Sequence, residues 1–74
     1  MKAILEFDLP TDNDEYLINV QARNTVCVLW DLDQYLRGQL KYNDKLTDEQ
    51  YKIFEELRDY LHNLLSEYDV RIDL

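Results

Sequence analysis

Apolar residues recur with a helical period through the middle of the chain. Between residues 25 and 42, one side of a helix would collect Val28, Leu29, Leu32, Leu36 and Leu40. A later segment is more regular, and its apolar side consists of Ile53, Phe54, Leu57, Leu61, Leu64, Leu65 and Tyr68. A shorter segment after Pro10 places Tyr16, Leu17 and Val20 together. The spacing predicts helices over about residues 12–23, 25–42 and 47–68.

The boundaries of these helices carry signals of different strength. Thr47 and Gln50 have the spacing of a capping box at the start of the last helix. Thr11 and Asp14 resemble a weaker version at the start of the first. Near residues 23–25 the apolar stripe drifts by roughly a quarter turn, which predicts a bend or a break between the first two helices.

Both ends of the chain alternate with a period of two instead. Residues 2–9 place Ala3, Leu5, Phe7 and Leu9 on one side, and residues 70–74 alternate in the same way. These segments predict two short terminal strands, so the expected class is α+β, a small helical domain with a minimal sheet. The strands would be antiparallel if the first two helices form one bent rod, which we favour, and parallel if they fold back on each other.

The length of 74 residues predicts one domain, residues 1–74, of marginal stability on its own. A single cysteine leaves no disulfide to support it, so we expect a homo-oligomer in a reducing compartment. The start of the chain lacks the apolar core of a signal peptide, and no apolar run approaches a membrane span. A soluble, cytoplasmic protein is expected.

The formal net charge of −8 opposes direct binding of nucleic acid or of a membrane. It leaves room for a basic protein partner or for mimicry of nucleic acid, and the simplest interpretation is that the charge keeps the protein soluble. The sequence contains no known catalytic motif. Its only histidine, His62, and its only cysteine, Cys27, are expected on separate helices. We expect His62 to be exposed and Cys27 to be buried. We therefore expect no enzyme activity, no catalytic residue, no metal site and no cofactor.

One stripe on the polar side of the central helix is the sharpest candidate for a binding site. It consists of Trp30, Gln34, Arg37 and Lys41, which we call the Trp30 stripe, and we expect Tyr35 and Tyr42 nearby. An aromatic ring beside a guanidinium and an ammonium can hold a carboxylate, a phosphate or a base. The competing interpretation buries Trp30 under another helix or a second copy. The tyrosines are compatible with an interface and equally with ordinary boundary packing.

Three segments together resemble a group of short acidic proteins encoded by tailed bacteriophages: residues 2–10, 30–37 and 40–42. The resemblance implies a phage accessory protein in the host bacterial cytoplasm. Our leading hypothesis is a non-enzymatic protein that binds and inhibits a host or anti-phage defence protein. The first alternative is an oligomeric sponge that sequesters a signalling nucleotide on the Trp30 stripe. The second is an acidic mimic of nucleic acid.

Overall fold

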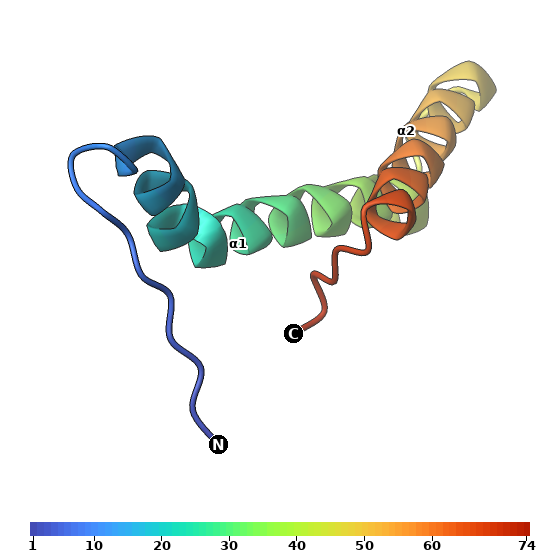
Figure 1. Ribbon diagram of the computed structural model, residues 1–74. Coiled ribbons are helices and arrows are strands. Elements are labelled where there is room, and N and C mark those ends of the chain that lie inside the picture. Colours follow the sequence, from blue (N-terminus) through green and yellow to red (C-terminus); the bar gives the residue numbers. More distant parts are fainter.

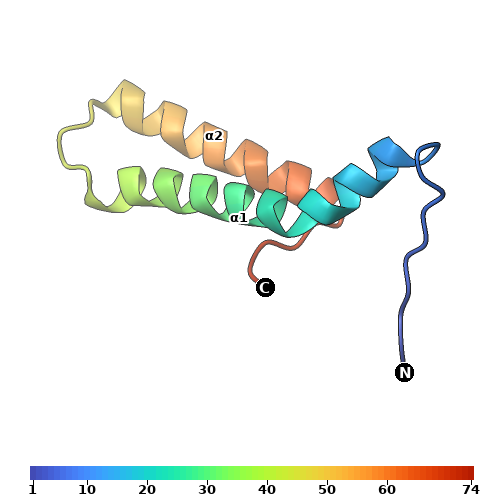
Figure 2. The same cartoon turned by 90° about the vertical axis from the view of Figure 1, so that its left-hand side faces the viewer.

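The chain folds into a hairpin of two antiparallel helices, in a computed structural model that describes residues 1–74. Helix α1 spans Asn13–Tyr42 and helix α2 spans Asp48–Glu67. Figure 2 shows them side by side, with the connector of residues 43–47 at one end. Because α1 has 30 residues and α2 has 20, the N-terminal part of α1 extends past the end of α2 (Figure 2).

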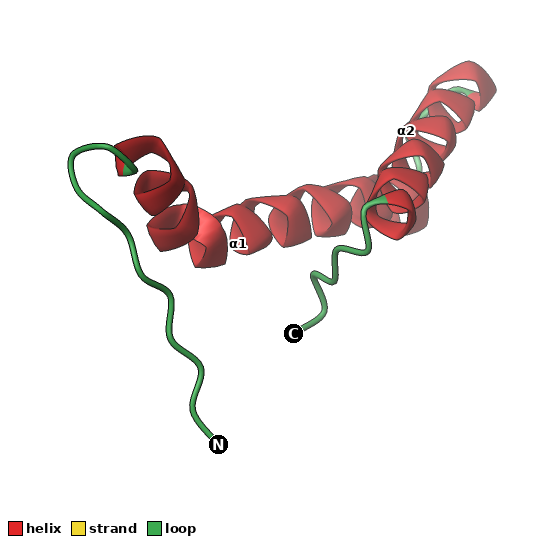
Figure 3. Cartoon of the chain, in the orientation of Figure 1, coloured by secondary structure: helices red, strands yellow, loops and turns green.

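The predicted α+β class is wrong, because neither terminal segment forms a strand (Figure 3). Residues 2–9 run away from the hairpin, and Figure 1 shows the two ends of the chain well apart. The N-terminal segment meets α1 through an edge-to-face contact between Phe7 and Tyr16, whose ring centroids are 5.8 Å apart. Alternation indicates which side of a strand would be buried, but a sheet also needs a partner strand within reach.

The predicted division into helices 12–23 and 25–42 is also wrong, because α1 continues through this region without a break. Of the two predicted alternatives, a bend or a break, the helix has the bend, at the light cyan turn in Figure 1. Nearby, the hydroxyl of Thr25 donates to the carbonyl oxygen of Gln21 at 3.1 Å, a bond that often bends helices. The bend redirects the apolar stripe while every residue stays helical.

The start of α1 differs from the predicted capping box at Thr11. Asp12 occupies the N-cap position and makes no side-chain bond to the helix. Its carboxylate accepts a hydrogen bond from the backbone N–H of Asp8 at 3.0 Å and so holds the turn that precedes the helix.

The start of α2 confirms the capping box predicted from Thr47 and Gln50. The Thr47 hydroxyl accepts from the Gln50 backbone N–H at 3.1 Å, and the Gln50 side chain accepts from the Thr47 N–H at 3.0 Å.

After the end of α2, Asp69 adopts a positive φ of 55° and the Val70 N–H donates to the Leu65 carbonyl at 2.8 Å. This is a Schellman motif. It turns the chain back at the position where the closing strand was expected.

The interior of the hairpin is small. Leu36 and Leu61 are its only buried apolar residues. The radius of gyration is 17.2 Å, whereas a compact chain of this length has about 11 Å. Two helices alone therefore leave much of their apolar surface uncovered. Neither helix combines the length and the apolar composition needed to cross a bilayer.

Candidate functional site

The Trp30 stripe lies along the part of α1 that pairs with α2. The Trp30 residue is 41% exposed, Lys41 is exposed, and Gln34 and Arg37 are half-buried. Neither Arg37 nor Lys41 forms an ion pair, since the ion pairs of the structure involve Arg58, His62 and Arg71. The stripe thus presents an indole and two uncompensated positive charges at the surface of an acidic protein.

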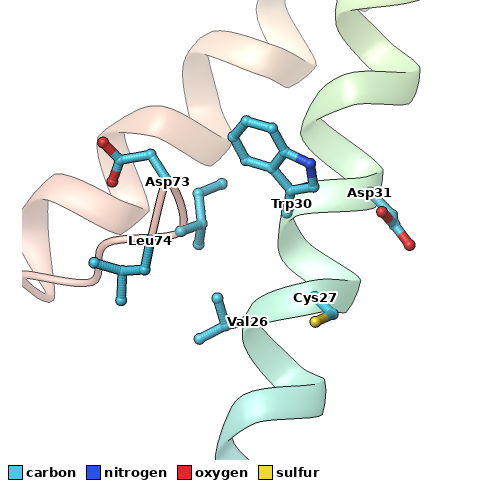
Figure 4. Close-up of a pocket in the computed structure, with 7 residues that line it drawn as sticks. Val26, Cys27, Trp30, Asp31, Asp73 and Leu74 are labelled. Carbon is cyan, nitrogen blue, oxygen red and sulfur yellow. The ribbon is translucent and has the colours of Figure 1, made fainter.

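The C-terminal tail covers one end of this stripe. Figure 4 shows Trp30 on α1, with its ring directed toward the tail that carries Asp73 and Leu74. A cavity of about 280 Å³ lies between them, lined by Val26, Cys27, Trp30, Asp31, Ile72, Asp73 and Leu74. Two of the lining residues are aspartates, which disfavour an anion. Arg37 and Lys41 lie outside the cavity, so a phosphate held by them would not enter it.

Tyr35 and Tyr42 are on a different side of α1 from the Trp30 stripe. Successive helical residues turn by about 100°, which places both tyrosines more than a quarter turn from the indole. The Tyr35 ring packs edge-to-face on Phe54 of α2, with centroids 6.5 Å apart. Tyr42 is exposed at the last residue of α1. The structure therefore brings together Trp30, Gln34, Arg37 and Lys41, and keeps the tyrosines apart from them.

A buried carboxylate forms a cluster that the sequence did not predict. Asp33 is 5% exposed. One of its oxygens, Oδ1, accepts from Arg58 Nε at 3.0 Å and lies 2.5 Å from His62 Nε2. Gln34 Nε2 donates to the other oxygen at 3.3 Å. We call Asp33, Arg58 and His62 the Asp33 cluster, and it joins the two helices.

Burial alone would raise the pKa of Asp33. The hydrogen bonds from Arg58 and His62, together with the positive charge of Arg58, outweigh burial and lower the pKa below its ordinary value of 3.8. The carboxylate is therefore charged at neutral pH. The sequence pattern predicts an exposed His62, and its side chain is 45% exposed, but its Nε2 contacts Asp33. One feature of the sequence could have indicated this cluster: Asp33 is an acidic residue between Leu29 and Leu36, on the otherwise apolar side of α1 that faces α2.

The chemistry of the Asp33 cluster is that of a structural link. No serine, threonine or cysteine hydrogen-bonds to His62, so the histidine has no nucleophile beside it. Cys27, which the sequence pattern predicts to be buried, is exposed. No group of three histidine, cysteine or acidic residues is arranged to hold a metal ion.

Comparisons of the chain with protein-family models, with curated proteins and with solved structures find no match.

Proposed function

We propose that this protein acts by binding another protein through the Trp30 stripe, as a non-enzymatic phage accessory factor that inhibits a host or defence protein. The resemblance of residues 2–10, 30–37 and 40–42 to short acidic phage proteins supports the phage context. The host bacterial cytoplasm is the compartment we propose, because a single unpaired cysteine suits a reducing environment.

The observation that carries the proposal is the exposed indole beside two unpaired cations. Tryptophan and arginine are the residues most enriched among those that dominate binding energy at protein interfaces. Trp30 is the only tryptophan of the chain, and 41% of it remains accessible in the folded hairpin. Arg37 and Lys41 extend the same stripe, so an acidic patch on the partner would complement it.

The nucleotide sponge gains no support from the cavity beside the indole, because Asp31 and Asp73 line it. A mimic of nucleic acid would use acidic surface, whereas the Trp30 stripe is locally basic. We favour a protein surface that places a carboxylate at Arg37 and Lys41, which lie outside the cavity that Asp31 and Asp73 line.

The test is capture of a partner from infected bacterial cells by tagged protein, compared between two charge reversals of the same type. Lys41 lies in the stripe and Lys52 lies on α2; both are exposed and make no ion pair. Lys41→Glu should weaken the captured complex by roughly tenfold or more, and Trp30→Ala by more than that. Lys52→Glu should leave it unchanged. Equal affinity of wild type and Trp30→Ala, with unchanged helicity, would refute the site.

A further inference from the structure

The side of the hairpin opposite the Trp30 stripe is an open apolar groove. Around the axis of α1, the direction that faces α2 lies between Trp30 and Leu32. Trp30 is rotated by about 100° from this direction to one side, and Leu32 by about 60° to the other. Leu32 and residues of α2 form a groove of about 260 Å³ whose lining is entirely apolar: Leu32, Leu36, Leu57, Tyr60, Leu61 and Leu64. Leu32, Leu57 and Tyr60 each remain about half exposed or more in the single chain. We call this surface the apolar groove.

The exposed area of the chain shows how much surface requires cover. A compact protein of this mass exposes about 4,900 Å², whereas this chain exposes 6836 Å². Part of this excess of about 2,000 Å² belongs to residues 2–9 and to the part of α1 that extends past α2. The rest lies on the hairpin itself, where a dimer through the groove would cover exposed apolar side chains such as Leu57 and Tyr60.

The charges around the groove permit two copies to meet despite the net charge. On α1 the flank of the groove carries the uncharged residues Val28, Tyr35 and Gln39. On α2 the outer flank carries Glu49 and Glu56. If α1 of one copy packs beside α2 of the other, each acidic flank meets a neutral one, and like charges are kept apart.

We infer that a second copy of this chain occupies the apolar groove, so that two hairpins form a four-helix bundle. On α2 the apolar residues Phe54, Leu57, Leu61, Leu64 and Tyr68 recur at alternating intervals of three and four. Phe54 and Leu61 of this series pack within the hairpin, whereas Leu57 and Leu64 extend the apolar side of α2 into the groove. Because the hairpin buries only Leu36 and Leu61 by itself, its other apolar side chains stay exposed to water unless another chain covers them. A second copy of the chain is present wherever the protein is made. The bundle leaves both Trp30 stripes on its outer surface, so the dimer stands independently of the proposed function.

The test is the mass of the full chain by sedimentation equilibrium over a wide range of concentrations, with two matched variants. Leu57 in the groove is 51% exposed and Val20, outside it on α1, is 54% exposed. Wild type and Val20→Glu should sediment as dimers. Leu57→Glu should raise the dissociation constant by roughly a hundredfold or more, because each dimer would bury two carboxylates, and every 1.4 kcal/mol is about tenfold.

Thiol labelling removes the dependence on how well the Leu57→Glu variant folds. In a Cys27→Ser background, the thiol of Tyr60→Cys should react more slowly with a bulky maleimide than the thiol of Glu55→Cys, which lies on another side of α2, because a second copy covers the groove. A wild-type chain that is monomeric and fully helical would overturn the inference. So would a Leu57→Glu variant that dimerises as tightly as wild type. Partner capture by the Trp30 stripe is measured separately, so the failure of one proposal is distinguishable from the failure of the other.

Discussion

The hydrogen bonds to Asp33 should stabilise the hairpin measurably. Asp33→Asn keeps the shape of the side chain and removes the charge that Arg58 and His62 contact at 3.0 and 2.5 Å. Hydrogen bonds to a charged group contribute about 1.5–3 kcal/mol. The partner side chains are 27% and 45% exposed, and water can replace part of the lost contact. We therefore expect the free energy of unfolding to fall by about 2 kcal/mol, in the lower half of that range.

The assay is urea unfolding followed by far-ultraviolet circular dichroism at one fixed protein concentration, since any association would add to the stability. In a thermal scan, the same loss corresponds to a fall in Tm of roughly 10 °C for a domain of this size. Asp31→Asn is the matched control, because Asp31 is exposed and forms no ion pair. It should change stability by less than about 0.5 kcal/mol. A loss no larger than this in Asp33→Asn would refute the reasoning.

The pH dependence of the same pair of proteins tests the sign of the effect. The folded pKa of Asp33 lies below the ordinary value of 3.8. The carboxylate therefore contributes its full stability above that pH, and the contribution is lost as the pH falls through the folded value. The difference between wild type and Asp33→Asn should shrink as the pH falls below about 4. A difference that continues to widen below about pH 4 would contradict the assignment.

Other parts of the hairpin give further predictions. Thr47→Ala removes one half of the capping box and should cost about 1 kcal/mol in urea unfolding; an unchanged midpoint would show that the cap does not hold α2. Gly38→Ala should stabilise the protein by up to about 1 kcal/mol, because a β-carbon there meets nothing within 4 Å; a lower Tm would reveal a close contact from a second chain. Truncation after Arg71 removes the tail side of the Trp30 cavity and should shift the indole fluorescence to longer wavelength. An unshifted spectrum would mean that the tail does not shield the ring.

The sequence by itself determined the features that depend on neighbours along the chain. Helical periodicity located α2 to within a residue or two, and the spacing of Thr47 and Gln50 identified its capping box. The same periodicity placed Trp30, Gln34, Arg37 and Lys41 on one stripe of α1 and so defined the candidate site. These features follow from a fixed rotation per residue and from hydrogen bonds between residues three or four apart.

Only the tertiary structure decided which segments meet. The N-terminal alternation found no strand to pair with, because a Schellman motif after α2 directs the tail toward Trp30 instead. The Asp33 cluster likewise depends on residues 25 and 29 positions apart, which become neighbours only when the helices pack in one register. Local patterns specify a face and its chemistry, but the partner of that face is set by packing between segments distant in the sequence.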